Sequence, residues 1–130
     1  MIMIERQHIS SDTNWENQIG YSRAVRVGNL IEVSGTTAVD GENIIGKGDV
    51  YAQAKFIFQK IEKALIQAGS GLDDVIRTRM YVTDISQWQE IGKAHADFFS
   101  KIKPAATMVE VKSLINPDLL IEIEVTAYVK

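Results

Sequence analysis

The chain has 130 residues, a formal net charge of -3 and no cysteine. This length fits a single domain, residues 1–130, with a hydrophobic core that needs no disulfide. The acidic balance and the lack of a Lys/Arg run argue against a nucleic-acid partner, while the missing cysteines exclude thiolate metal sites and suit a cytoplasmic protein.

A hairpin is the first element predicted along the chain. In residues 27–35, VGNLIEVSG, a Gly-Asn pair stands between apolar runs, which is typical of a turn that joins strands near 23–27 and 30–35. The Gly- and Asp-rich segment 36–49 then predicts a loop. The N-terminal segment carries charge within its first six residues and has no long apolar run, so we expect neither a signal peptide nor a membrane span.

A long amphipathic helix is predicted next. Asp49 suits its N-cap position, apolar residues recur at helical spacing after it, and Gly69 ends the pattern. Residues 75–83 alternate and are rich in β-forming residues, which predicts a strand.

The remaining segments predict one more helix and two strands. The sequence SQWQ at 86–89 resembles a capping box and predicts a helix that extends to about Lys101. Pro104 ends that stretch, and strands are expected at about 105–111 and 119–129. The sequence NPD at 116–118 predicts the turn between them.

These elements predict an α+β fold in which two helices cover one face of a mixed or largely antiparallel sheet. Alternation in the last strand places apolar residues toward the helices and Glu122, Glu124, Thr126 and Tyr128 on the other face. Two further sets each share a face of their own strand: Arg77, Arg79 and Tyr81, and Ala106, Met108 and Glu110. Alternation does not show which face each set joins. If both join the Glu122 face, that surface suits an oligomer interface or a pocket.

The same residues also have structural interpretations. Cross-strand Arg–Glu pairs on an exposed sheet contribute about 0.2–1 kcal/mol each and explain Arg77, Glu110 and Glu124 as well as a site does. His95 lies on the apolar stripe of the second helix with Trp88, where a histidine is more often a hydrogen-bonded core group than a catalyst.

Two features of the sequence do not by themselves indicate a chemical activity. Gly92 in mid-helix costs about 1 kcal/mol relative to alanine, so it could allow close approach of a neighbour or a ligand. The two histidines, His8 and His95, lack metal-ligand spacing, and no cofactor is expected.

Four separated segments resemble one known family. They are GYSRAVRVGNLIEVSG (20–35), YVTDISQWQEIGKAHADFF (81–99), PAATMVEV (104–111) and IEIEVTAYV (121–129). In this order and spacing they are similar to the Rid/YjgF family of small enamine/imine deaminase-related proteins, over essentially the whole chain. The resemblance implies a chorismate-mutase-like fold and a homotrimer with ligand sites in clefts between subunits.

The resemblance also implies roles for individual residues. Active members hydrolyse 2-enamine and 2-imine acids, with an arginine that binds the substrate carboxylate and a glutamate that directs water at the imine carbon. Tyr21 matches a pocket tyrosine, Gly35 lies in the Ser-Gly segment, and Glu122 matches the glutamate. The arginine position is Ala106 and a helix asparagine position is Gly92, so this sequence lacks two members of the family's site.

Three functional hypotheses follow. The favoured one is a Rid-family trimer that binds a small metabolite in a cleft formed by Tyr21, Gly35, Met108 and Glu122, with altered or lost deaminase activity. The second is a working deaminase or related hydrolase that uses Glu122 with Arg79 or His95. The third is an endoribonuclease-type activity, which the acidic balance argues against.

Overall fold

The computed structural model describes residues 4–11 and 13–130. The first three residues of the N-terminal segment discussed above lie outside this part. No helix among the described residues is long and apolar enough to cross a membrane. In chain order the elements are β1 (Arg6–Ile9), α1 (Asn14–Ile19), β2 (Ala24–Val27), β3 (Leu30–Thr36), β4 (Val39–Asp40), β5 (Asn43–Ile44), α2 (Val50–Gln67), the 3-10 helix η1 (Leu72–Asp74), β6 (Val75–Val82), the 3-10 helix η2 (Ile85–Gln87), α3 (Trp88–Phe99), β7 (Ala105–Glu110) and β8 (Ile121–Tyr128).

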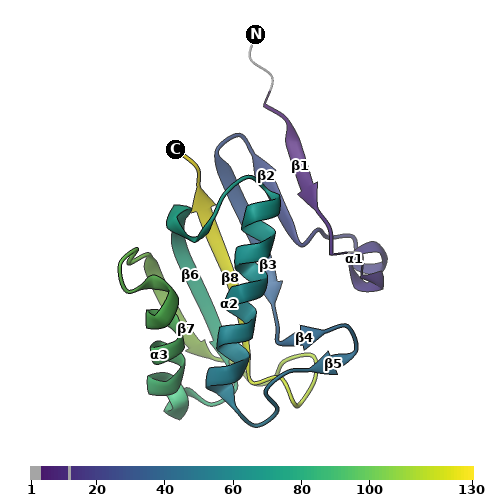
Figure 1. The fold of residues 1–130 in the computed structure, drawn as a ribbon. Helices are drawn as coiled ribbons and strands as arrows, with labels where there is room; N and C mark the ends of the chain where they lie inside the picture. The colour runs from purple at the N-terminus through teal and green to yellow at the C-terminus, as the bar shows by residue number, and fades with distance from the viewer. Residues whose placement is uncertain (1–3, 12) are drawn as a thin grey trace.

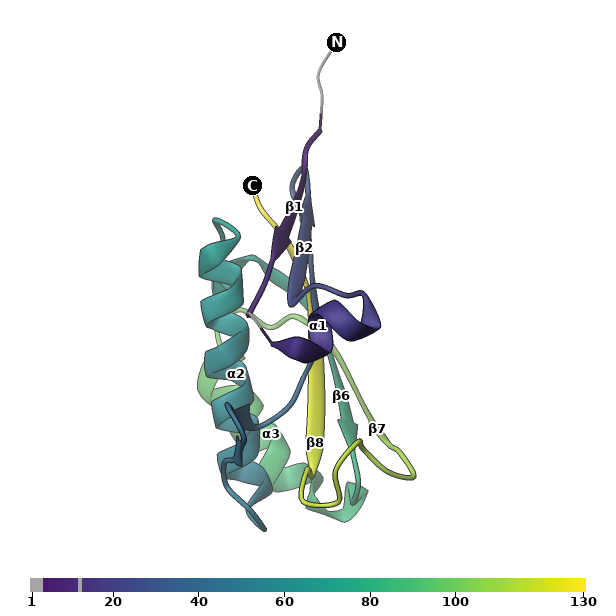
Figure 2. The same cartoon turned by 90° about the vertical axis from the view of Figure 1, so that its right-hand side faces the viewer.

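One six-stranded sheet organises the chain, with the strand order β1-β2-β3-β8-β6-β7 (Figure 1). All neighbours are antiparallel except β6 and β7, which are parallel. Seen along its edge, the sheet carries α2 and α3 on one side, while the short α1 lies at the other side near the start of β2 (Figure 2). The predicted α+β fold with two helices on one face is confirmed. We call the face turned away from α2 and α3 the open face.

The core fills the space between the sheet and the two long helices. Asp49 caps α2, because its side chain accepts a hydrogen bond from the backbone nitrogen of Ala52 at 3.0 Å. Ile57, Phe58 and Ile61 of α2 are fully buried, and each such side chain contributes about 1.5–3 kcal/mol relative to an exposed one. The period-2 burial of β8 also follows the prediction, with its apolar residues toward the helices.

A buried amide of α2 fixes the start of β8. Gln53 has no exposed surface, and its side chain donates to the carbonyl of Asp118 and accepts from the nitrogen of Leu120, both at 2.9 Å. These bonds hold the turn at 116–118 against the helix. They therefore set the register at which β8 enters the sheet.

The structure differs from the sequence prediction at two places. The segment 36–49 contains the small β4–β5 hairpin and is not a plain loop. The second helix begins at Trp88, two residues after Ser86, the first residue of the predicted capping box, and Trp88 is 56% exposed. Ser86 does not cap this helix, because its backbone nitrogen and its hydroxyl both donate to the carboxylate of Asp84, which caps the 3-10 turn η2.

Glu16 anchors the N-terminal segment, where the sequence analysis placed no element. This residue is only 4% exposed, and its carboxylate accepts hydrogen bonds from Ser10, Ser11 and Thr13. Burial by itself would raise the pKa of Glu16, but the hydrogen bonds from Ser11, Ser10 and Thr13 outweigh it and lower the pKa from 4.5. The ionised carboxylate of Glu16 therefore stabilises the described residues that lead through α1 to Tyr21.

We expect Glu16→Gln to lower the free energy of unfolding by about 1–3 kcal/mol at pH 7, because it weakens a buried network. A depressed pKa stabilises the fold above the unfolded-state pKa, and this contribution is lost as the pH falls through the folded-state pKa. The difference between wild type and variant should therefore shrink below about pH 4.5. Urea unfolding at several pH values measures it. The control is Glu42→Gln at an exposed turn, and an equal effect of both changes would contradict the anchoring role.

Candidate functional site

The register of β6 against β8 shows which residues share the open face with Glu122. Tyr81 lies opposite Glu122 and Arg79 lies opposite Glu124. Directly paired residues of a sheet point to the same side. Arg77, Arg79 and Tyr81 are therefore on the Glu122 face, which the sequence left undecided.

The residues of β7 that were predicted to line the pocket lie on the other side of the sheet. Ala106 pairs with Thr78 and Met108 pairs with Met80, and both partners are buried beneath the helices. Glu110 follows the same alternation. The sequence left open whether this set joins the Glu122 face, and within a single chain it does not. Thr107 faces the open side instead and accepts a hydrogen bond from Arg77 Nη2 at 2.7 Å.

Glu122 lies directly over a glycine. A Cβ atom added to Gly35 would be 2.1 Å from Glu122 Oε2, so any side chain at position 35 would occupy the place of the carboxylate. Within the described residues the carboxylate accepts no side-chain or loop hydrogen bond, although it is half-buried. Burial raises the pKa of Glu122, the charge of Arg23 opposes this shift, and the charge of Glu124 adds to it.

Arg23 is a member of this site that the sequence analysis missed. Its Nη2 donates to the carbonyl of Gly35, and its guanidinium lies 5.9 Å from the centre of the Tyr21 ring. The available signal was alternation, since Ala24 is buried in the core and Arg23 must then point to the open face. Tyr21, Arg23, Gly35 and Glu122 are thus brought together by the end of β3, the start of β2 and β8.

Arg79 has partners on the same face, away from Gly35. Its Nη1 lies 3.5 Å from Thr126 Oγ1. The neighbouring Tyr81 hydroxyl donates to Glu124 at 2.6 Å, and this bond, together with burial, raises the pKa of Tyr81. Glu124 is therefore engaged, whereas Glu122 is not.

His95 and Gly92 lie on the helix-covered side. His95 Nε2 is 2.9 Å from Thr78 Oγ1, and its ring packs against those of Phe58 and Phe99. Burial lowers the pKa of His95, which favours the neutral imidazole of a core group. Outside the backbone of its own helix, a Cβ at Gly92 would meet no atom of the described residues within 4 Å.

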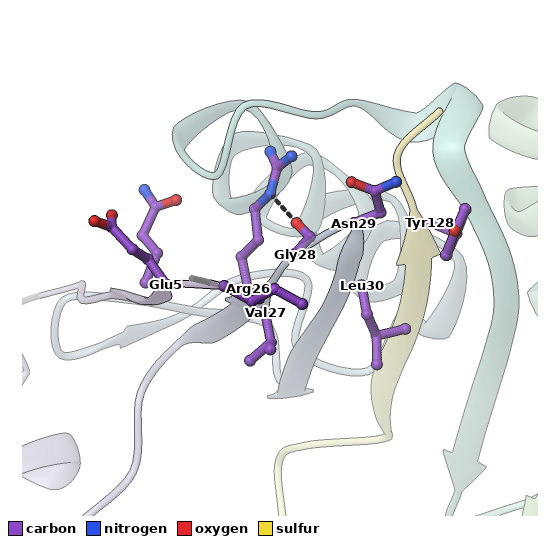
Figure 3. Close-up of a pocket in the computed structure, with 9 residues that line it drawn as sticks. Glu5, Arg26, Val27, Gly28, Asn29, Leu30 and Tyr128 are labelled. Carbon is purple, nitrogen blue, oxygen red and sulfur yellow. Dashed lines mark hydrogen bonds between the residues drawn. The ribbon is translucent and has the colours of Figure 1, made fainter. Parts of the chain in front are cut away.

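A surface hollow of the described chain lies elsewhere. It has a volume of about 830 Å³, lies at the β2–β3 turn, and contains none of the predicted site residues. Figure 3 shows Arg26 pointing away from Val27 and Leu30, with a 2.9 Å hydrogen bond from Arg26 Nε to the carbonyl of Gly28. Among the described residues, no group of three or more His, Asp or Glu side chains could hold a metal ion.

Gly35→Ala should push the Glu122 carboxylate out of its position, at a cost in stability of about 1–3 kcal/mol. The carboxylate then becomes more solvated, and the pKa of Glu122 should move back toward 4.5. Carboxyl-carbon NMR titration measures this shift. Gly71→Ala is the matched control, because its backbone is extended and a Cβ there meets nothing within 4 Å. An unchanged Glu122 titration in Gly35→Ala would contradict the close contact.

The six-stranded mixed sheet with two long helices on one face is a chorismate-mutase-like α+β fold. In this sheet the Glu122 carboxylate lies over Gly35. The family model described as Endoribonuclease L-PSP matches residues 13–129. The crystal structure of Rv2704 from Mycobacterium tuberculosis, described as a member of the YjgF/YER057c/UK114 family, is 50% identical. It has a TM-score of 0.88, with 96% of this chain and 100% of that chain covered. The chain belongs to the Rid/YjgF family.

Curated relatives agree with this assignment. A RutC family protein from Pyrococcus abyssi is 38% identical and covers 83% of this chain and 85% of its own length. The 3-aminoacrylate deaminase RutC of Acinetobacter baylyi is 33% identical, with 84% and 86% covered.

Proposed function

We propose that the protein is a homotrimer that binds a small metabolite in clefts between subunits, with altered or lost imine deaminase activity. One observation carries this proposal. The predicted site residues fall into two groups on opposite sides of the sheet, with Glu122 and Gly35 on the open face and Ala106 and Met108 on the helix-covered side. A cleft lined by both groups can form only where the β7 edge of one subunit lies beside the open face of another.

The chemistry of the open face supports an interface. It carries half-buried charged side chains, among them Arg77, Arg79 and Glu122, and no long helix covers it. A symmetric assembly that buries this face would place the Glu122 carboxylate in a cleft whose walls exclude bulk water.

Ala106 and Gly92 support a change in activity. Without an arginine at position 106, a carboxylate substrate loses a bidentate partner in the arrangement that the family resemblance implies. The Glu122 carboxylate could still direct a water molecule, but it would act on a poorly held substrate. Binding without fast hydrolysis is the expected result, and we expect this activity in the cytoplasm.

A working deaminase is the second candidate, and the identity to the 3-aminoacrylate deaminase RutC favours it. It would use Glu122 with Arg79 or His95. The bonds of Arg79 to Thr126 and of His95 to Thr78 make both residues less suited to this role. A direct assay of imine hydrolysis distinguishes the two candidates.

An RNA-directed activity is a third candidate, because the matching family model is described as Endoribonuclease L-PSP. The net charge of -3 argues against it. Retention on RNA that falls steeply with salt would support this activity.

Native mass measurement and ligand titration test the favoured function. We expect a species of about three times the mass of one chain, as for a closed cyclic trimer. A monomer at micromolar concentration would contradict the cleft. A trimer that hydrolyses 2-iminobutyrate rapidly would favour the second candidate.

A further inference from the structure

Arg23 lies where a ligand bound beside Glu122 would meet a positive charge. Its guanidinium donates through Nη2 to the carbonyl of Gly35, the residue over which the Glu122 carboxylate lies. The guanidinium is therefore tied to the backbone that carries the site, and its position does not depend on a flexible loop.

The guanidinium has unused hydrogen-bonding capacity. Its Nε is buried and donates to no atom of the described residues, and no described carboxylate lies within salt-bridge distance of it. A buried donor without a partner is costly and is usually satisfied by water, an ion or a ligand. Glu122 is the carboxylate whose charge state Arg23 influences, yet the two side chains form no direct ion pair.

The other cations near this site are engaged or distant. Lys60 Nζ donates to the carbonyls of Thr37 and Val39 at 3.0 and 2.8 Å. The Lys60 ammonium group thus bonds to the backbone that follows β3. Arg23 is then the cation beside Glu122 with hydrogen-bonding capacity for a ligand.

The arginines of β6 lie farther along the sheet. Arg77 also has a buried Nε without a partner. Tyr81, however, is the residue opposite Glu122, and Arg77 is four positions away from it, about 13 Å at the rise of a β-strand. Arg79 lies opposite Glu124 and points to Thr126.

We propose that Arg23 binds the carboxylate of the ligand in the Glu122 cleft, and thereby selects small monocarboxylates. The inference rests on the proposed function, because it needs that cleft to form. A planar guanidinium fork matches a carboxylate. A dianion such as phosphate would be repelled more strongly by the neighbouring Glu122. Tyr21, whose ring lies beside the guanidinium, would limit the size of the ligand.

The test uses 2-oxobutyrate, a stable monocarboxylate, titrated into the trimer and followed by calorimetry. We expect Arg23→Gln to weaken binding about 10- to 100-fold, the effect of losing one charge-assisted pair. Arg23→Lys, which keeps the charge without the planar fork, should give an intermediate affinity. Arg26→Gln is the matched control. Arg26 lies in β2, which begins directly after Arg23, and it also donates to backbone carbonyls, but its bonds go to Gly28 and Ala68.

Each outcome has a defined meaning. If Arg23→Gln binds 2-oxobutyrate as tightly as wild type, this inference is wrong and the proposed function stands. If the wild-type trimer does not bind 2-oxobutyrate, this inference is wrong, whereas the proposed function is contradicted by a monomeric protein. If phosphate binds more tightly than 2-oxobutyrate, the selectivity is wrong. If Arg23→Gln does not fold, the inference is tested in the wild type through the NMR resonance of the Arg23 side-chain Nε. It should shift on addition of 2-oxobutyrate, and an unchanged resonance overturns the inference.

Discussion

Ala106→Arg should raise the rate of 2-iminobutyrate hydrolysis by about 10-fold or more over a slow wild type, because it restores a bidentate partner for the substrate carboxylate. The family resemblance places an arginine at this position, and Glu122 remains available to direct water. The new arginine would bind the substrate carboxylate together with Arg23. Stopped-flow or coupled dehydratase assays measure the rate.

The structure has room for this substitution. Ala106 is exposed on the edge strand β7, so the arginine side chain meets no packed core within the chain. Gly92→Asn can be added, since a side chain at Gly92 has open space around it. Its cost should be small, because asparagine is a better helix former than glycine.

Gln59→Arg is the control for Ala106→Arg. It adds an arginine to the exposed side of α2, away from β7 and from the open face. It should not raise the rate. Robust wild-type turnover that collapses in Arg79→Ala would contradict the degenerate site and would support a deaminase that uses Arg79.

Thr126→Arg should convert the proposed trimer into monomers at micromolar concentration. Thr126 lies on the open face directly opposite Arg77, and Arg79 Nη1 is 3.5 Å from its hydroxyl. If the open face is an interface, an arginine at position 126 would be buried beside Arg77 and Arg79, with Glu32 opposite it on β3. Burying a charge costs several kcal/mol, which a nearby carboxylate offsets only in part, and each 1.4 kcal/mol weakens subunit binding about tenfold.

The monomer itself should remain folded, because Thr126 is partly exposed in a single chain and the new side chain can reach water. Native mass measurement and circular dichroism distinguish dissociation from unfolding. Gln59→Arg adds the same charge to the exposed side of α2 and should leave the assembly unchanged. If Thr126→Arg keeps the wild-type mass, the open face is not the interface and the proposed cleft is misplaced.

Much of the fold could be predicted from local patterns. The apolar spacing after Asp49 and the alternation in 119–129 gave the long helix and the central strand, because both depend on residues close in sequence. The start of α3 was placed too early, because Ser86 bonds to Asp84 at the cap of the 3-10 turn η2, and the N-cap residue of α3 is Gln87. The anchor formed by Glu16 was missed because it depends on three hydroxyl groups arranged by the turn before α1.

The candidate site was harder to predict, because it depends on register. A strand on its own shows which residues alternate, but not which face meets its neighbour. The pairing of Ala106 with Thr78 places Ala106 and Met108 on the helix-covered side of the sheet, and a shift of one residue would have reversed this. Arg23 belongs to the site only because Gly35 and Glu122 are adjacent in space, although 87 positions separate them along the chain. No short motif contains that contact.

β8 is the last strand of the described chain, and it connects the two halves of the sheet, β1–β3 and β6–β7. β8 lies between β3 and β6, and the strands on its two sides pair with each other only through it (Figure 1). Until residues 121–128 leave the ribosome, β1–β3 and β6–β7 each present an apolar face with an unpaired edge, which is the form most prone to aggregate. The native sheet can therefore close only after β8 has been synthesised. A premature stop before Ile121 should yield insoluble chains and not a shortened but folded protein.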